Sequence, residues 1–334
     1  MPRSVTLELT DPLAYQAVMR PGDGDVLITS KGRFRVELTR IDLDRLWMTW
    51  GDEDLPRLTH FAQSRERTTI AFLADRKQAN TQCAGIEMAP GEIIAKPAGA
   101  SYHVRTFGPC RWRAMSLPPH DLAAAVHAAS GCHHIIPSVA NMGRPDRGNF
   151  ARLSCLQDET RRLAVTAPEM FAHPVVSRAL EQTLMHAMTT CLVAHLPVGA
   201  DSRWRHHSAI IKRFEEFLAA NSDRPVHLLE MCAAVGASER TLRICCEEHL
   251  GMGPIRYLWL RRMHLARRAL LLGDPANTSV IQTATKYGFW ELGRFAVSYR
   301  QLFDESPSAT LQRSPGPHRE FRDRPLKFAR VSTA

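Results

Sequence analysis

Apolar residues recur at helical spacing through most of the second half of the chain. Between residues 204 and 313 they follow one another at intervals of three or four, and Gly or Pro marks the short breaks. This spacing places the apolar side chains on one face of a helix. We therefore predict that residues 204–313 form an all-helical domain. Two further helices are expected at residues 149–166 and 174–195.

The first 120 residues follow a different pattern. Short runs of β-branched and aromatic residues alternate with clusters of Gly, Pro and Asp. Such runs predict the short strands of a β-sandwich or barrel. A short helix rich in Ala is expected next, up to residue 130. The predicted fold class is thus α+β, with a β-rich N-terminal domain, a helical linker and an all-helical C-terminal domain.

The same pattern divides the chain into four parts. The β-rich domain is expected to cover residues 1–130. A helical linker, which also offers a dimerisation surface, covers residues 131–203, and the all-helical domain covers 204–313. Residues 314–334 contain five basic residues and no apolar period. We therefore expect them to form a disordered basic tail.

Two segments of the helical region have the pattern of a helix-turn-helix motif. Residues 228–242 and 280–295 each have a small residue four positions before a glycine, which is Gly236 in the first and Gly288 in the second. The small residue allows two helices to approach closely, and the glycine adopts the backbone conformation that the tight turn requires. We expect each segment to present one helix to DNA.

A single long helix is expected to connect the two motifs. Pro254 suits the first turn of a helix, and Gly273 and Pro275 end it after Leu272. At 1.5 Å per residue, its ~19 residues span about 28 Å. That length approaches the ~34 Å between successive major-groove faces on one side of DNA. One chain could therefore bind two neighbouring major-groove segments.

Candidate DNA-binding residues lie on the outer faces of the two recognition helices. They are Arg240, Thr241, Arg243 and Ile244 in the first helix, and Glu291, Leu292, Gly293, Arg294 and Val297 in the second. Ser238 is expected to cap the first helix, and the second turn is one residue longer when counted from its glycine. Arginine can bind guanine through two hydrogen bonds. Because the first helix offers two arginines and the second only one, we expect the first motif to contribute more sequence specificity.

The charge and the cysteines narrow the class of protein. The net charge is +9, and seven of these charges lie after residue 200. A basic C-terminal part suits a polyanion such as DNA. The eight cysteines include no CxxC pair, which argues against a disulfide framework or a zinc site. No apolar run reaches the ~18 residues of a membrane span and no signal-peptide core is present, so we expect a cytoplasmic protein without a membrane partner.

The helical region resembles the DNA-binding domain of AraC-family transcription regulators over about residues 207–312. Asp304 departs from the family's pattern, which usually has glycine there, and residues 290–295 look closest to the ethanolamine-operon regulators. The resemblance implies an activator that binds double-stranded promoter DNA through both recognition helices. It also implies RNA polymerase and a small-molecule effector as partners, and a possible homodimer. The positions that match the pattern are Gly288, Phe289, Phe295, Tyr299, Phe303 and Pro307.

The family resemblance further implies a cupin-like effector-binding domain at the N-terminus. Residues 91–103 resemble the second cupin box, but the usual first box is absent. Only His60, His103 and His120 occur in the first 120 residues, whereas a metal needs several converging ligands. We therefore expect no metal, no cofactor and no catalytic residue. Arg105, Arg111 and Arg113 could pair with an anionic effector or face solvent. The candidate effector-binding residues are Trp47, Trp50, Tyr102, His103 and Trp112.

Two other functions stay open at this point. A constitutive DNA-binding protein whose N-terminal domain only dimerises would bind no effector. A metal-dependent cupin enzyme fused to a DNA-binding domain would contain stoichiometric metal. The sequence favours an effector-responsive regulator that is not an enzyme over both.

Overall fold

The computed structural model describes residues 3–19, 25–130, 141–193, 202–222 and 224–313. The basic tail predicted at 314–334 lies outside the described residues, as do residues 131–140 and 194–201 of the predicted linker. No helix in the described ranges combines the length and the apolar character needed to cross a membrane.

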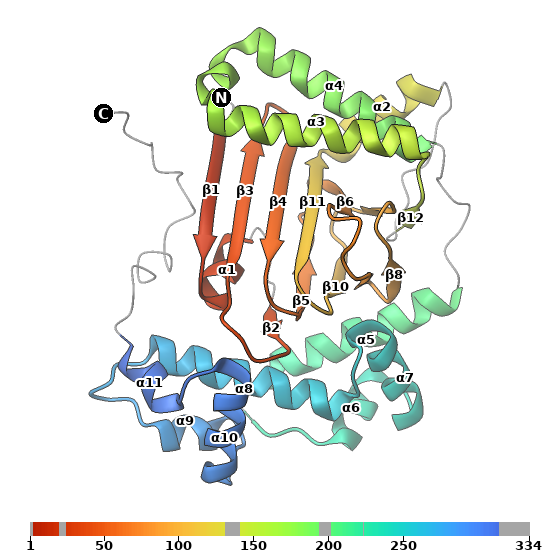
Figure 1. Cartoon of the computed structure of the whole chain (residues 1–334). Coiled ribbons are helices and arrows are strands. Elements are labelled where there is room, and N and C mark those ends of the chain that lie inside the picture. Colours follow the sequence, from red (N-terminus) through yellow and green to blue (C-terminus); the bar gives the residue numbers. More distant parts are fainter. Residues whose placement is uncertain (1–2, 20–24, 131–140, 194–201, 223, 314–334) are drawn as a thin grey trace.

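The N-terminal domain is a sandwich of two antiparallel sheets, as the sequence predicts (Figure 1). The short helix α1 (Pro12–Val18) packs beside β2. Strand β12 follows residue 130, so one strand of the larger sheet comes from the segment that was expected to be linker. The seven-stranded sheet has the order β1 (Arg3–Leu9), β3 (Val36–Asp42), β4 (Trp47–Glu53), β11 (Cys110–Leu117), β6 (Thr68–Leu73), β9 (Ile93–Lys96) and β12 (Asn141–Gly143). The five-stranded sheet has the order β2 (Val26–Ile28), β5 (Arg57–Ala62), β10 (Ser101–Arg105), β7 (Thr81–Cys83) and β8 (Ile86–Met88).

Side chains alternate between the two faces of β4, so neighbouring residues of this strand belong to different parts of the core. Met48 and Trp50 face the helical layer outside the sandwich and are buried there. Gly51 lies on the opposite face, directly across from Trp112 of β11. A Cβ atom at Gly51 would lie only 2.3 Å from the Trp112 ring. The absence of a side chain at this position is therefore what leaves room for the indole between the sheets.

A layer of helices packs across one end of the outer face of the seven-stranded sheet (Figure 1). It consists of α2 (Pro119–Ser130), α3 (Arg147–Thr166), the 3-10 helix η1 (Pro168–Ala172) and α4 (Pro174–Val193). Leu153 of α3 and Leu184 of α4 are fully buried against the sheet. Glu181 of α4 accepts a hydrogen bond from Arg45 Nε at 3.0 Å. The two helices expected at 149–166 and 174–195 are thus present, and within one chain they pack on the sandwich.

The C-terminal domain is entirely helical in its described residues, as predicted. Its helices are α5 (Ser202–Ala220), α6 (Leu228–Val235), α7 (Glu239–Leu250), α8 (Pro254–Leu272), α9 (Val280–Lys286), α10 (Leu292–Phe303) and α11 (Pro307–Gln312). One apolar core joins them. The long helix expected between the two motifs is α8, and its bounds agree with those read from Pro254 and Leu272.

The five-stranded sheet docks on the helical domain. Leu27 of β2 and Leu58 of β5 belong to the same apolar cluster as the helices of that domain. His264 of α8 donates a hydrogen bond to the carbonyl oxygen of Ile28 at 3.1 Å, and Arg267 of α8 forms an ion pair with Asp11 at 2.9 Å. The sandwich therefore contacts the helix that spaces the two motifs.

Candidate DNA-binding surface and its link to the sandwich

The first motif is formed by α6 and α7 and is closed by local backbone signals. Gly236 ends α6 with φ +64°, in the left-handed region that favours glycine. Ser238 caps α7, since its hydroxyl accepts a hydrogen bond from the Thr241 backbone N–H at 3.1 Å. Leu242 on the inner side of α7 is fully buried. The turn thus holds α7 with its other side directed outward.

The outer side of α7 exposes the arginines that the sequence singles out. Arg240 and Arg243 are exposed, while Thr241 and Ile244 are half-buried. Arg243 donates a hydrogen bond to Glu239 one turn earlier at 3.0 Å. No hydrogen bond or ion pair within the described part of the chain engages Arg240. Both guanidinium groups can therefore turn toward a ligand, and Arg243 exchanges only a weak surface contact for it.

The second motif is formed by α9 and α10, and its turn is longer and lacks the side-chain cap of the first motif. Gly288 has φ +79°, and α10 begins at Leu292, one residue later after its glycine than α7 does. Glu291 occupies the N-cap position but makes no side-chain capping hydrogen bond. Four residues of the predicted DNA-binding face are exposed on α10, and they are Leu292, Gly293, Arg294 and Val297.

The aromatic residues that carry the family resemblance form the core of the second motif. The rings of Phe289, Phe295, Tyr299 and Phe303 follow one another with centroid distances of 4.9, 5.6 and 4.7 Å. Aromatic pairs at such distances contribute about 0.5–1.5 kcal/mol beyond their burial. Asp304 ends α10 with φ +59°, which lies in the left-handed region that favours glycine.

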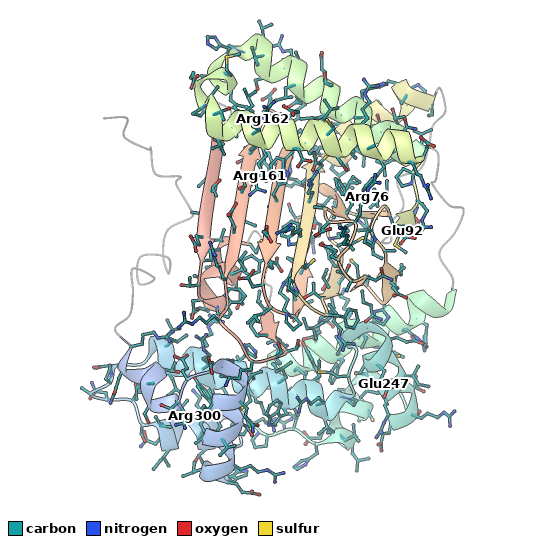
Figure 2. The ribbon with its side chains drawn as sticks, in the orientation of Figure 1. Arg76, Glu92, Arg161, Arg162, Glu247 and Arg300 are labelled. Carbon is teal, nitrogen blue, oxygen red and sulfur yellow. The ribbon has the colours of Figure 1, made fainter. Side chains whose placement is uncertain are left out.

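Charged side chains lie at both ends of the molecule, far from one another. Figure 2 shows Glu247 of α7 and Arg300 of α10 projecting from the helical domain, and Arg162 of α3 at the opposite end beyond the sandwich. Arg162 pairs with Glu159 on its own helix. It therefore serves as a reference for a surface arginine that is remote from both recognition helices.

The five candidate effector residues do not form one site. Tyr102 and Trp112 lie in the cluster between the two sheets, and Trp47 lies on the same face of β4 as Gly51. Trp50 instead faces the helical layer. His103 faces the helical domain, where its Nε2 lies 3.0 Å from Glu215 Oε1. The structure separates Tyr102 from His103 because neighbouring residues of a strand point to opposite faces.

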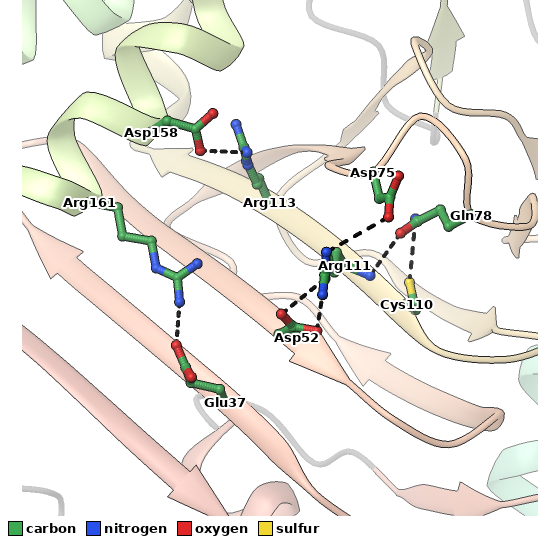
Figure 3. A network of polar contacts seen from close by, with 9 residues as sticks. All are labelled: Glu37, Asp52, Asp75, Gln78, Cys110, Arg111, Arg113, Asp158 and Arg161. Atoms are coloured by element: carbon green, nitrogen blue, oxygen red, sulfur yellow. Dashed lines mark hydrogen bonds and ion pairs between the residues drawn. The ribbon is translucent and has the colours of Figure 1, made fainter.

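Of the three arginines that were considered for an anionic effector, Arg111 and Arg113 lie on one face of β11, whereas Arg105 ends β10. Arg111 pairs with Asp52 at 3.1 Å and with Asp75 at 3.8 Å, and Arg113 pairs with Asp158 of α3 at 2.6 Å (Figure 3). Arg105 lies across the backbone of Gly251, where an added Cβ atom would overlap its guanidinium group. Carboxylates of the protein itself already neutralise Arg111 and Arg113.

Lys96 is a buried cation that sequence reasoning missed. It ends β9, is 9% exposed, and no carboxylate among the described residues pairs with it. Its ammonium nitrogen lies 4.9 Å from the centre of the Tyr102 ring and 6.0 Å from that of Phe61. Burial lowers the pKa of Lys96. The sequence did contain a sign of this burial, since Lys96 directly follows the three apolar residues 93–95.

Glu215 of α5 is the polar centre of the interface between the domains. It accepts hydrogen bonds from Tyr257 at 2.5 Å and from Arg261 at 2.6 Å, in addition to the contact with His103. Burial alone would raise the pKa of Glu215, but the hydrogen bond from His103 and the charge of Arg261 outweigh it and lower the pKa to about 2. Arg261 also reaches Asp25 at 3.5 Å. An ionised carboxylate thus connects β10 with α5 and α8.

These features define a double helix-turn-helix domain docked on a β-sandwich. Residues 231–313 match the family described as helix-turn-helix domain. The chain is similar to the probable thc operon regulatory protein of Rhodococcus erythropolis, with 34% identity over 158 residues that cover 45% of this chain and 45% of that protein. It is also similar to XylDLEGF operon transcriptional activator 2 of Pseudomonas putida, with 34% identity over 100 residues that cover 30% of this chain and 64% of the relative.

The chain is also similar in part to a solved structure. A probable AraC family transcriptional regulator from Rhodopseudomonas palustris is 34% identical, with coverage of 31% of this chain and 95% of that one and a TM-score of 0.29. This chain covers less than two thirds of the length of either curated relative. Through its helical domain the chain is therefore similar to helix-turn-helix proteins that regulate transcription.

Proposed function

We propose that this chain regulates transcription by binding promoter DNA with α7 and α10 in two successive major-groove segments. The observation that carries the proposal is that both helices bury one side and expose the other. Arg240 and Arg243 are exposed on α7, and Arg294 is exposed on α10. The 19-residue helix α8 separates the two motifs.

The two recognition helices contribute unequally to base recognition. Each arginine that binds guanine through two hydrogen bonds discriminates by about 1–3 kcal/mol. Helix α7 exposes two arginines, whereas α10 exposes Leu292 and Val297 beside its single arginine. Apolar side chains can contact only thymine methyl groups or the sugar-phosphate backbone. Sequence specificity therefore resides mainly in α7.

Selection of binding sites from a random DNA library tests this proposal. The library is selected with the wild-type chain, with Arg243→Ala and with Arg162→Ala as a control that removes one remote charge. Arg243→Ala is expected to lose a guanine preference at one position and to keep the preferences at the others. Arg162→Ala is expected to keep all of them. If Arg243→Ala changes only the salt dependence of binding, the base-reading role is wrong.

The interior of the sandwich supports an effector-responsive regulator. A buried ammonium without a carboxylate partner is costly unless a ligand supplies the counter-charge. Lys96 has this character, and Tyr102 and Trp112 of the candidate effector set lie in the cluster at its side of the sheet. We therefore assign the effector to the class of small anions such as carboxylic acids, with Lys96 as the charged contact.

A thermal-shift screen separates this sensor from a constitutive DNA-binding protein. Carboxylic acids are compared with small amines, which the resemblance of residues 290–295 to ethanolamine-operon regulators suggests, and with sugars. A stabilising acid whose effect disappears in Lys96→Met supports the proposal. If no compound stabilises the chain or changes promoter binding, the constitutive alternative is favoured.

The remaining parts of the proposal concern partners. The similar Pseudomonas putida protein is named an activator, which supports activation through RNA polymerase in the cytoplasm. Val165 of α3 and Val175 of α4 are 70% and 81% exposed, so this part of the predicted 131–203 segment offers a surface for a homodimer. Sedimentation of the wild-type chain and of Val175→Asp tests it, since a monomer in the variant alone is expected.

A further inference from the structure

Two histidines of the five-stranded sheet lie side by side on the face that docks against the helical domain. His60 of β5 and His103 of β10 are directly opposite each other in the antiparallel register. Their rings stack with a centroid distance of 4.7 Å and an interplanar angle of 21°. Both point away from the space between the sheets, into which the neighbouring Tyr102 points. They are therefore separate from the interior, where a cupin metal would lie.

A carboxylate of the other domain completes the cluster. Glu215 of α5 approaches within 3.0 Å of His103 Nε2. One donor atom from each of His60, His103 and Glu215 can be chosen so that all three lie within 4.8 Å of one another. His103 and Glu215 are 3% and 6% exposed, and His60 is half-buried. Two of the three donor residues are thus shielded from bulk solvent at a domain interface, and His60, whose Nε2 also lies 2.6 Å from Ser101 Oγ, is at its edge.

We propose that His60, His103 and Glu215 bind one divalent transition-metal ion of the zinc type, which bridges the two domains. Two imidazole nitrogens and one carboxylate oxygen are a donor set that zinc uses in proteins, with water as a fourth ligand. Bonds of about 2.0–2.2 Å place tetrahedral ligand atoms about 3.3 Å apart. The widest separation in the cluster therefore has to shorten by at most about 1.5 Å.

One proton has to move before the cluster binds a metal. The Glu215 carboxylate is ionised. Metal binding replaces the hydrogen bond between His103 Nε2 and Glu215 Oε1, and the proton on Nε2 moves to Nδ1 or to solvent. No electron transfer is involved.

Arg261 and Tyr257 position the carboxylate and do not have to leave it. Arg261 binds the other carboxylate oxygen, Oε2, and Asp25 balances its charge. Tyr257 donates a hydrogen bond from its hydroxyl to Oε1. When His103 no longer donates to Oε1, this oxygen has a second lone pair that can bind the metal. Groups that orient a ligating carboxylate in this way raise the affinity of a site.

Because the ligands come from two domains, the metal binds the docked arrangement in preference to the separated one. By linkage, metal binding stabilises docking of the sandwich on α5 and α8. This metal site at the interface does not depend on effector binding inside the sandwich.

The test uses the full-length chain after removal of metal with a chelator. Zn²⁺ is titrated by calorimetry in competition with a chelating dye, and Co²⁺ is followed by its visible absorption. The wild-type chain is expected to bind one equivalent, and His60→Ala is expected to lower the affinity at least about tenfold. His60→Cys is expected to restore binding and to add a thiolate–Co²⁺ absorption band. Hydrogen exchange of the β10 and α5 amides is expected to slow on Zn²⁺ addition.

Two controls make the test decisive. His120→Ala removes an 82% exposed histidine of α2 and is expected to bind like the wild type. Unfolding curves without metal show whether His60→Ala is folded, and if it is not, His103→Gln replaces it. The absence of stoichiometric binding in the wild type overturns the proposal. Equal affinity of the wild type and the folded variant overturns it too, because the metal would then occupy another site.

Discussion

Protonation of His264 opposes docking of the two domains. This side chain of α8 donates one hydrogen bond to the Ile28 carbonyl oxygen across the interface. Burial lowers the pKa of His264 to about 4 from an ordinary value of 6.5, and the nearby charge of Arg267 adds to the effect. Asp11 and Asp25 face it as well and act in the opposite direction. Between about pH 4 and pH 6.5, His264 is therefore neutral in the docked structure and charged when unfolding exposes it.

The size of the effect follows from proton linkage. As pH falls below 6.5, His264 of the unfolded chain becomes protonated, whereas the docked His264 stays neutral until about pH 4. The free energy of unfolding therefore decreases between these two pH values. At pH 5 this titration lowers the free energy of unfolding by at most about 2 kcal/mol, and at pH 7 by only a few tenths of a kcal/mol. His264→Gln removes the titration but retains an N–H donor for Ile28.

The assay is urea unfolding of both chains at pH 7 and pH 5. The free energy of unfolding is expected to fall more between these values in the wild type than in His264→Gln, by about 1–2 kcal/mol. The variant has its own cost at both pH values, since it loses the edge-on contact with Phe303, and the comparison of pH differences cancels that cost. An equal loss of stability in both chains refutes the reasoning.

Three further substitutions test other parts of the account by urea unfolding at pH 7. Lys96→Met is expected to raise the stability of the ligand-free chain by about 1–3 kcal/mol, because it removes a buried unpaired ammonium; a destabilised variant would mean that Lys96 is already satisfied. Gly51→Ala is expected to cost about 1–3 kcal/mol because its Cβ overlaps the Trp112 ring, and unchanged stability would contradict the packing. Asp304→Gly is expected to gain about 0.5–1 kcal/mol by relieving the left-handed backbone, since the exposed ion pair with Lys31 contributes little. A loss would show that this pair matters more than the strain.

The recognition helices could be predicted from the sequence because their signals are local. Ser238 and Gly236 lie within a few residues of the helix ends that they determine. The spacing of Leu242 fixes which side of α7 is buried, and the same holds for Phe295 in α10. Such features depend on neighbours along the chain, so they appear in a single sequence.

The directions of the candidate effector residues were harder to predict, because they depend on strand alternation and on what covers each sheet. Trp50 and Trp112 are both large aromatic residues in strands, yet one faces the helical layer and the other faces the sheet interior. The adjacency of Tyr102 and His103 did contain a usable signal, since two neighbours in a strand cannot line one pocket.

The histidine–glutamate cluster could not have been predicted from spacing. His60 and His103 are far apart in the sequence, and strand pairing between β5 and β10 brings them together. Glu215 comes from the other domain and reaches them only when the domains dock. The expectation of no metal site rested on the few histidines of the first 120 residues and on the absent first cupin box, and neither takes account of a ligand from the other domain.

Methylation interference on a selected promoter fragment tests the central claim most directly. The claim is that one chain reads two successive major-groove segments with α7 and α10. It predicts that guanine methylation blocks binding in two segments about 10 base pairs apart on one face of the DNA. It also predicts that Arg243→Ala removes the interference at one guanine of only one segment. A single interfering segment, or loss of interference in both segments with Arg243→Ala, would contradict the account.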